Sequence, residues 1–532
     1  MVQNNSKIRI LLSNIVLLPL LFIQSCDDST ETISLPQYNA EYSINDCPID
    51  ITSDYSVECG TLTVPETRRF ADNGKIIKLA VLKIKSESTA GNEPMFYLHG
   101  GPGGRALSIF DYIASNFETI LTDRDLILFD QRGSGFSEPS LKCPEVDTAT
   151  IYSLQNELGN RDTNIQYFTA VDNCKNRLLN DNVSIPSYNT LENIEDVNDL
   201  RKTLQLEKIN LYGASYGTRL ALLYLNKYPG FVSSAVIDGV LPPQSPIVNE
   251  NAVLALENNI SKIFDLCESQ TSCNERYPNL KERFWSEISR LNANNASYQF
   301  VVSEHSIDTT QTFSGRDFLS FIQYLMETDR VNKIPQYAHD IMNEDYSRII
   351  SYEISLLDPS DFSLGKLLSA DCADDTRTND IKAALSGKTF HEEILEQKQG
   401  SQVGLSFNCD FWEFDPEQGI SSSPVQSQVS VLVLNGEYDV RTPPAQGDLA
   451  AETLSNASII TVPQEGHVVF DNQCAMSISS AFFDSPSSTL DTSCISEVAD
   501  LTFDIIDTIS KPTKPNFFDP RENKLFLAPL LN

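Results

Sequence analysis

Short apolar runs bounded by glycine, proline and polar residues occur in two parts of the chain and predict buried β-strands. In the first part, residues 60–65 and 75–84, the second of which alternates in part, are separated by a polar turn, which predicts an antiparallel hairpin. More uniformly apolar runs, typical of strands covered on both faces, follow at 95–98, 125–129, 208–212, 233–241, 429–434 and 457–462.

The segment between these two parts has a helical periodicity. Apolar residues recur at helical spacing in 249–268, 275–291, 315–327 and 333–344, with few strand signals. We therefore predict that residues 245–425 form a helical domain inserted between two parts of one sheet-containing core, residues 46–244 and 426–532. The alternative is a separate structural domain remote from any site. The end of the second core part, after about residue 510, is rich in proline and predicts an irregular tail.

The first 45 residues have the pattern of an export signal and a tether. Lys7 and Arg9 precede an apolar run, residues 10–23, that is too short to span a bilayer comfortably but suits a signal peptide. The sequence Ile-Gln-Ser-Cys at 23–26 then resembles the lipobox of bacterial lipoproteins, in which the cysteine is acylated. We expect residues 1–25 to be a lipoprotein signal peptide, Cys26 the lipidation site and residues 26–45 a tether. A plain secretory signal followed by a chance cysteine is the alternative.

Composition restricts the classes of partner. Of 532 residues, 41% are hydrophobic and 21% charged, which excludes wholesale disorder. The formal net charge of −34, with no basic cluster, argues against nucleic acid as a partner. The acidity favours solubility, or attraction of cationic groups such as the amino terminus of a peptide.

The cysteines fit an exported protein. There are eleven, and removing Cys26 leaves ten, an even number that predicts disulfides in an oxidising compartment. Neighbours in sequence suggest five local loops, from Cys47–Cys59 to Cys474–Cys494, but the sequence leaves the connectivity open. No cysteine or histidine cluster has metal-ligand spacing, so we predict no structural zinc.

Candidate chemistry lies after the strand 208–212. Residues 213–217 read Gly-Ala-Ser-Tyr-Gly, and 218–228 form a largely apolar helical stretch that ends before Pro229. A strand, a tight turn and a helix in this order are what a nucleophile elbow requires, and the flanking glycines allow strand and helix to approach closely. The pattern predicts Ser215 as a nucleophile above a helix N-terminus. An ordinary glycine-containing turn is the alternative.

Three motifs together resemble a known family. Residues 99–104 (His-Gly-Gly-Pro-Gly-Gly), 130–137 (Asp-Gln-Arg-Gly-Ser-Gly-Phe-Ser) and 213–217 are similar to those of the prolyl iminopeptidase and tripeptidyl aminopeptidase family of α/β-hydrolases. Residues 138–145 and 188–190 resemble its exported, disulfide-containing branch. The resemblance implies an α/β-hydrolase fold, a mostly parallel sheet flanked by helices with an inserted helical cap. It also implies cleavage of short N-terminal pieces from peptides.

The order of chemical groups along the chain agrees with that fold. Asp439 and His467 each lie just past a predicted strand, and the order Ser215, Asp439, His467 is that of an α/β-hydrolase triad. Glu437 is a rival for the acid, but Asp439 matches the family's G-x-x-D-x-x-T-P pattern. The backbone N–H groups of Tyr216 and Gly101 are expected to form the oxyanion hole. Hydrolysis by this triad would proceed through an acyl-enzyme and is expected to need no cofactor.

The resemblance implies further roles. Asp130 and Arg132 are expected to form an ion pair or to brace their loop, and His99 to be structural. Because residues 372–375 and 409–412 resemble the exported branch, Cys372–Cys409 is the favoured bridge. Asp374 and Asp375 are candidates for binding the amino group of the substrate, with a solvated acidic loop as the alternative.

The residues and the resemblance together favour an exported serine aminopeptidase, lipid-anchored to a bacterial cell membrane, that releases N-terminal prolyl residues or di- and tripeptides. Its partners would be a peptide with a free N-terminus and the membrane. A carboxylesterase or related acyl hydrolase on the same scaffold is the main alternative. A catalytically inactive binding module is a third, against which the complete triad argues. The sequence leaves the oligomeric state open.

Overall fold

The computed structural model describes residues 39–68, 74–86, 88, 91–328, 330–357, 362–375, 380–415 and 419–505. The expected signal peptide, Cys26 and the proline-rich tail lie outside these residues. The expected tether, 26–45, overlaps a strand, β1 (Glu41–Ile44), so the sheet begins inside that range.

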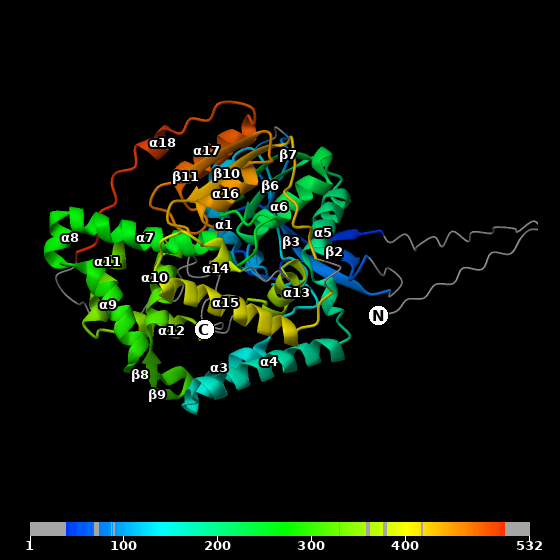
Figure 1. Cartoon of the computed structure of the whole chain (residues 1–532). Helices are drawn as coiled ribbons and strands as arrows, with labels where there is room; N and C mark the ends of the chain where they lie inside the picture. The colour runs from blue at the N-terminus through cyan, green and yellow to red at the C-terminus, as the bar shows by residue number, and fades with distance from the viewer. Residues whose placement is uncertain are drawn as a thin grey trace, which may run out of the picture. The chain divides into compact units, whose positions relative to one another are not determined.

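Within the described residues, one nine-stranded sheet has the order β1-β2-β3-β5-β4-β6-β7-β10-β11 (Figure 1). Strands β1, β2, β3 and β5 pair antiparallel, whereas β5, β4, β6, β7, β10 and β11 pair parallel. The remaining bounds are β2 (Val57–Pro65), β3 (Ile76–Ile84), β4 (Met95–Leu98), β5 (Leu126–Phe129), β6 (Ile209–Ala214), β7 (Val232–Asp238), β10 (Ser430–Gly436) and β11 (Ala457–Val462). The chain has the predicted α/β-hydrolase fold.

Helices cover both faces of the sheet because successive strand side chains point to opposite sides. Phe96 and Leu98 belong to the core on one face, and Met95 and Tyr97 to the core on the other. The first face packs α5 (Thr190–Thr203), α6 (Tyr216–Lys227) and α16 (Pro444–Ala451), and the second packs α1 (Phe110–Asn116), α2 (Glu118–Leu121) and α17 (Gln473–Asp484).

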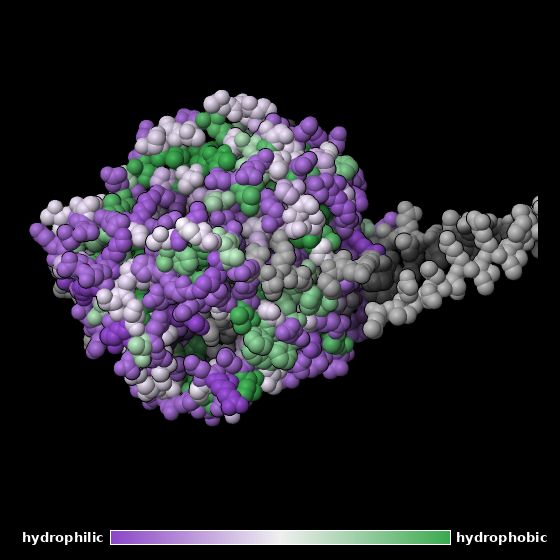
Figure 2. Space-filling model, viewed as in Figure 1, coloured by the Kyte–Doolittle hydropathy of each residue, from purple (hydrophilic) through white to green (hydrophobic). Residues whose placement is uncertain are grey.

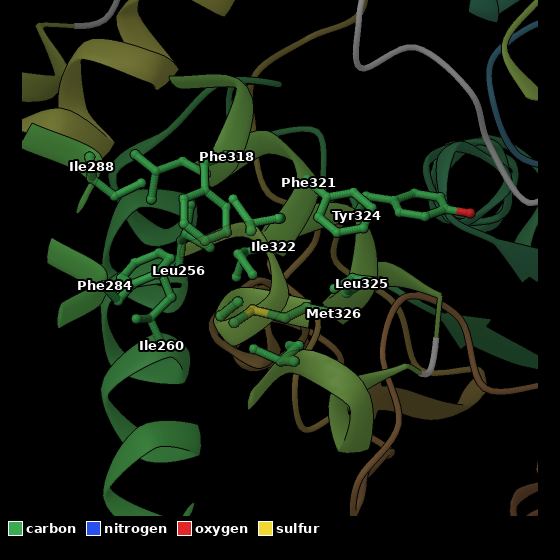
Figure 3. Close-up of a cluster of buried hydrophobic side chains, with 14 of the residues drawn as sticks. Leu256, Ile260, Phe284, Ile288, Phe318, Phe321, Ile322, Tyr324, Leu325 and Met326 are labelled. Atoms are coloured by element: carbon green, nitrogen blue, oxygen red, sulfur yellow. The ribbon is translucent and has the colours of Figure 1, made fainter. Parts of the chain in front are cut away.

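The segment between β7 and β10 has a hydrophobic core of its own. In Figure 3, side chains of α7, α9 and α10 meet in this core, including Leu256, Phe284 and Phe318. Its helices are α7 (Glu250–Ser269), α8 (Thr271–Arg276), α9 (Leu280–Ala293), α10 (Gly315–Glu327), α11 (Ile334–Met342), α12 (Ser347–Ser355), α13 (Leu364–Asp374), α14 (Ile381–Ala384) and α15 (Glu392–Phe411). We refer to residues 245–425 as the cap.

Two features of the helical layers were not predicted. The cap contains an antiparallel pair, β8 (Ala296–Val302) and β9 (Ile307–Phe313), whose alternating buried side chains join the cap core. Between β5 and β6 lie two further helices, α3 (Pro144–Gln155) and α4 (Asn160–Asn180), and α4 packs against α15. A short α18 (Ser493–Ser496) follows α17.

Five disulfides join the ten expected cysteines as sequence neighbours. They are Cys47–Cys59, Cys143–Cys174, Cys267–Cys273, Cys372–Cys409 and Cys474–Cys494. The favoured Cys372–Cys409 bridge is confirmed, and it ties α13 to α15. Such bonds persist in an oxidising compartment. Among the described helices, none is both long and apolar enough to cross a membrane.

Candidate active site

Ser215 occupies a strained turn between β6 and α6. Its backbone has φ 55° and ψ −121°, outside the conformations that a side chain ordinarily allows. The flanking glycines make this turn possible. A Cβ on Gly213 would lie 2.5 Å from the carbonyl oxygen of Gly217, and one on Gly217 would lie 1.8 Å from that of Leu98. The turn therefore requires glycine at both positions and directs Ser215 away from the sheet edge.

The structure brings Ser215, His467 and Asp439 together at the carboxyl ends of three parallel strands. His467 Nε2 lies 2.9 Å from Ser215 Oγ, and His467 Nδ1 lies 2.8 Å from Asp439 Oδ2. All three side chains are buried, with 4%, 2% and 0% of their surfaces exposed, respectively. The hydroxyl, imidazole and carboxylate thus form one continuous hydrogen-bonded chain.

Asp439 is held as an anion by its own turn. Its Oδ1 accepts the backbone N–H groups of Arg441 and Thr442, each at 2.8 Å, and its Oδ2 accepts the Thr442 hydroxyl at 2.8 Å. Burial raises the pKa of Asp439, but His467 and these donors outweigh it and lower the pKa below its ordinary value. The rival Glu437 faces elsewhere, since it pairs with Lys262 and accepts the backbone N–H of Gln464 at 2.9 Å.

A buried carboxylate also fixes the loop that carries His467. Asp238, at the end of β7, accepts the backbone N–H of Val469 at 2.9 Å and the hydroxyl of Tyr212 at 2.9 Å. Its backbone carbonyl accepts the N–H of Ser215 at 2.8 Å. One residue therefore positions both the nucleophile and the imidazole loop, a role the sequence analysis missed.

The expected oxyanion donors are Tyr216, next to Ser215 in the chain, and Gly101. Tyr216 is the first residue of α6, whose N-terminus favours negative charge. Gly101 borders the same cavity as Ser215 and has φ 126°, a region that glycine adopts without strain. Nearby His99 is a structural residue. Its Nδ1 lies 3.1 Å from the Tyr97 hydroxyl, and burial lowers its pKa to about 4.

Asp130 and Arg132 brace two different parts of the molecule and do not pair with each other as one expectation had it. Asp130 accepts backbone N–H groups of Ala106, Leu107 and Phe136 at 2.7, 3.1 and 2.8 Å. Arg132 pairs instead with Asp196 on α5 at 2.7 and 2.8 Å. Burial of both side chains makes this pairing necessary, since an unpaired buried charge is costly.

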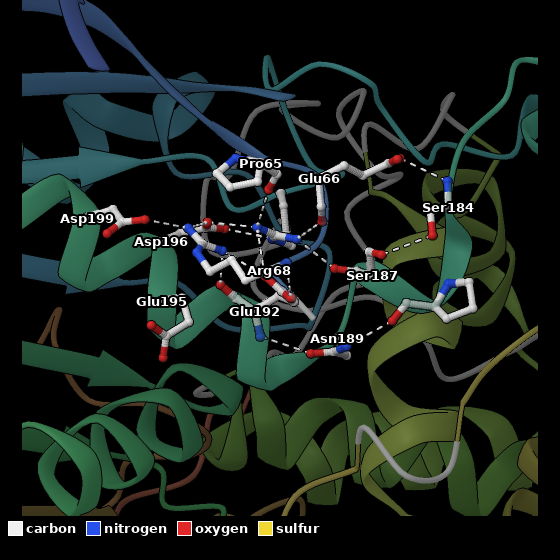
Figure 4. A network of polar contacts seen from close by, with 12 residues as sticks. Pro65, Glu66, Arg68, Ser184, Ser187, Asn189, Glu192, Glu195, Asp196 and Asp199 are labelled. Carbon is white, nitrogen blue, oxygen red and sulfur yellow. Dashed lines mark hydrogen bonds and ion pairs between the residues drawn. The ribbon is translucent and has the colours of Figure 1, made fainter. Parts of the chain in front are cut away.

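Asp196 belongs to a larger ionic network along α5. Figure 4 shows Arg68 reaching Glu192, Asp196 and Asp199, with nitrogen–oxygen distances of 2.7, 2.8 and 2.8 Å. Both arginine-bearing loops are thereby fastened to α5. The network supports the scaffold, as the brace interpretation expected.

A cavity of about 210 Å³ opens at Ser215 and is bounded by both the core and the cap. Aliphatic side chains form much of its wall, from the loop after β7, from α13 and from α15. Among the described residues, four charged ones line it: Glu327 on α10, Asp371 on α13, Lys398 on α15 and Arg441 after β10.

The alpha/beta hydrolase fold family matches residues 93–473, well over half of the chain. The chain belongs to this family. By fold and family it is a hydrolase, and the expected resemblance is confirmed at this level.

Three curated relatives refine the comparison. The hydrolase is 22% identical to the putative hydrolase YuaR of Escherichia coli over 439 residues, covering 77% of this chain and 82% of that protein. It is 29% identical to a tripeptidyl aminopeptidase of Streptomyces lividans, over 37% of this chain and 38% of that protein. It is 20% identical to a proline iminopeptidase of Lactobacillus acidophilus, over 60% of this chain and 84% of that protein. The match therefore spans less than half of the tripeptidyl aminopeptidase.

Three acidic residues lie at the end of α13 in this hydrolase, and each has different surroundings. Asp374 accepts the Thr190 hydroxyl at 2.5 Å and lies 3.7 Å from Arg219, and Asp375 accepts the N–H of Ile247 at 2.6 Å. Neither borders the cavity, whereas Asp371, one turn earlier, does. Burial, reinforced by Asp374, raises the pKa of Asp371 well above its ordinary value. Its carboxylate makes no hydrogen bond with a described residue.

A cap residue, Glu327, contacts both loops that carry the acid and the imidazole. Its carboxylate pairs with Arg441 at 2.6 Å, and its backbone carbonyl accepts the N–H of His467 at 3.3 Å. The helical periodicity of residues 315–327 predicts Glu327 at the end of a helix but indicates no role for it. Arg441 lies within the G-x-x-D-x-x-T-P motif at 436–443. It was the one sequence signal for a charged group beside Asp439 in this hydrolase.

Proposed function

We propose that the protein is an exported serine aminopeptidase that releases N-terminal prolyl residues or di- and tripeptides from peptides. One observation carries the proposal: the Ser215 hydroxyl, bonded to His467, opens into a cavity that also holds the carboxyl group of Asp371. A bound ammonium would lower the raised pKa of Asp371 and pair with its carboxylate, so the cavity would select a cationic group over a neutral one. The names of the aminopeptidase relatives support the same direction.

The proposed reaction uses side chains and water. Ser215 attacks the carbonyl carbon while His467 takes its proton through Nε2, and Asp439 holds the Nδ1–H tautomer. The N–H groups of Tyr216 and Gly101 stabilise the oxyanion. His467 then protonates the leaving amine, and a water activated by the same imidazole hydrolyses the acyl-enzyme.

The cavity supports a short substrate segment. Its volume of about 210 Å³ lies below the roughly 300–1,000 Å³ typical of pockets for drug-sized ligands. The cap helices α13 and α15 border it, so the acyl part of a substrate would extend from Ser215 toward them. A small cavity with an acidic group favours a few N-terminal residues over the interior of a long chain.

A substrate panel tests this proposal. Aminoacyl, prolyl and tripeptidyl nitroanilides with free amino groups should be hydrolysed, and their N-acetyl counterparts should react at least tenfold more slowly. Asp371→Asn should reduce kcat/KM for the free amines about 10- to 100-fold, the value of a hydrogen bond to a charged group, and leave short-chain nitrophenyl esters within twofold. Ser215→Ala should abolish both activities. Hydrolysis of esters without any anilide would overturn the aminopeptidase proposal.

The aliphatic wall favours one second candidate, a carboxylesterase. Leu241, Leu364, Leu367 and Leu368 border the cavity and would accommodate an acyl chain. Ester hydrolysis that rises with acyl length, without amide cleavage, would establish it. An inactive binding module would instead fail to react with a fluorophosphonate, which should label the wild type and not Ser215→Ala.

The proposal includes attachment to a membrane through Cys26. The disulfides support an oxidising compartment, and Cys26 itself lies outside the described residues. Cys26→Ser should move the protein from the membrane fraction to the soluble fraction. A wild type already found in the soluble fraction would contradict lipidation.

A further inference from the structure

The end of the cavity between α10 and α15 carries an excess of positive charge. Two cationic side chains, Lys398 and Arg441, line this end, and one carboxylate, that of Glu327, lies beside them. Arg441 already pairs with this carboxylate. Its Nη2 lies 2.6 Å from Glu327 Oε2, and its Nε lies 3.2 Å from the same oxygen. The other oxygen, Oε1, accepts the amide of Gln323 at 2.7 Å. Among the described residues, Lys398 is therefore left without a carboxylate partner.

The Lys398 ammonium is buried and only partly satisfied. It donates to Gln323 Oε1 at 2.7 Å, and no other described residue accepts from it. The residue is 6% exposed, and burial lowers its pKa to about 8, with Glu327 raising the pKa and Arg441 lowering it further. At neutral pH the group is mostly charged, with two N–H groups free to donate into the cavity. A buried cation of this kind is costly unless an anion pairs with it.

We propose that Lys398 binds a carboxylate of the substrate, so that the cavity favours substrates carrying a negative charge beyond the reacting carbonyl. The inference rests on the hydrolase activity proposed for the same site. The carboxylate would come either from an acidic side chain in the N-terminal part of a peptide or from the terminal carboxylate of a short peptide. Asp371 and Lys398, on helices joined by Cys372–Cys409, would then read opposite charges on one substrate.

The rival role for Lys398 is structural, a link from α15 to α10 through Gln323. Loss of such a link would affect every substrate equally. Loss of a carboxylate site would affect anionic substrates alone. The comparison therefore needs substrates that differ in charge but little in shape.

The decisive measurement uses two nitrophenyl esters, the monoester of glutaric acid and the ester of pentanoic acid. The wild type should prefer the glutarate at least tenfold in kcat/KM. Lys398→Met, which keeps the aliphatic stem, should lose most of this preference and leave the neutral ester within about twofold. The control is Lys382→Met. Lys382 is an exposed lysine that pairs with Glu392 outside the cavity, so this variant should keep the wild-type preference for the glutarate. No preference in the wild type, or equal losses on both esters in Lys398→Met, would overturn the inference.

Peptide arms identify the source of the carboxylate. Anilides with Glu and Gln near the N-terminus test the side chain, and short peptides with free or amidated C-termini test the terminus. The ester arm requires no amide cleavage, so the aminopeptidase proposal can fail while Lys398 retains its role. Should neither esters nor anilides be hydrolysed, glutarate should still raise the Tm of wild type and not of Lys398→Met. Equal shifts in both proteins would contradict the site.

Discussion

Asp439 and Glu437 are two carboxylates after the same strand, and their surroundings give them different roles. Asp439 is fully buried and accepts hydrogen bonds from its own turn while it faces His467. Glu437 is partly exposed and faces Lys262. An acid that orients an imidazole needs fixed donors and exclusion from water, which the turn provides at position 439 alone.

Substitution of these two acids tests the assignment. Asp439→Asn should reduce kcat about 10⁴-fold, because the amide favours the wrong imidazole tautomer. Glu437→Gln should change kcat less than about threefold. Steady-state kinetics on one anilide or ester, with fluorophosphonate labelling to count active sites, provides the comparison. A large loss in Glu437→Gln with a small one in Asp439→Asn would reverse the assignment.

Among single residues, the sequence predicts the functional side chains that directly follow a strand and misses those that lie on helices. Ser215, Asp439 and His467 could be found because parallel strands carry their carboxyl ends to one edge. Ser320, Gln323 and Glu327 line the cavity from α10 at helical spacing, but such a polar stripe opposite an apolar one is equally typical of a helix facing water. Lys398 gives no signal either, since α15 is polar on most sides and its burial arises from packing.

Whole elements were also easier to predict in the sheet than in the helical layers. Strands β2 to β7, β10 and β11 were predicted within a few residues, because buried runs bounded by glycine and proline are distinctive. Strand β1 was missed, since it lies inside the range expected to be a tether. Helices α3 and α4 and the pair β8–β9 were missed, and all of them pack on other parts of the helical layers. Helices α3 and α4 have a weak apolar periodicity, for which tertiary contacts and Cys143–Cys174 compensate. The pair β8–β9 does alternate, but it lies within a segment whose periodicity is otherwise helical.

The bridge Cys372–Cys409 should control the shape of the cavity more than its chemistry. It closes 37 residues and joins α13, which carries Asp371, to α15, which carries Lys398. Replacing both cysteines by alanine should raise KM about three- to tenfold, since misplacement of positioning groups weakens binding. It should leave kcat within about twofold, because the triad lies on core elements.

The Cys267–Cys273 bridge offers a matched control for that variant. It spans 6 residues between α7 and α8, and neither cysteine borders the cavity. Its removal should lower Tm without raising KM. Equal KM values in the two double variants would show that the α13–α15 bridge has no influence on substrate binding.

The many acidic residues of the molecule lie partly on its surface and partly in its interior, and those in the interior affect its stability. The visible face in Figure 2 is mostly hydrophilic, as expected for a chain of net charge −34. Several carboxyl groups are nevertheless buried or half-buried, and their burial raises the pKa of Asp130, Asp147 and Asp374 to about 6. These groups bind protons more tightly in the folded state, so they destabilise the fold as pH rises from about 4 to 6. His99, whose pKa is lowered to about 4, acts in the opposite direction over a similar range.

Glu353 on α12 isolates this effect at a single site. Burial, with a smaller contribution from Asp317, raises its pKa from 4.5 to about 7. Well below pH 4.5 the carboxyl group is protonated in both the folded and the unfolded state, so Glu353→Gln should unfold with nearly the wild-type free energy. Above pH 7 the folded wild type carries a poorly solvated charge that glutamine lacks. The variant should then be more stable by about 1–2 kcal/mol, allowing for the partial solvent screening of this side chain. Urea unfolding at pH 5, 6, 7 and 8 measures the difference, and a gap that stays constant across this range would show that Glu353 titrates normally in the fold.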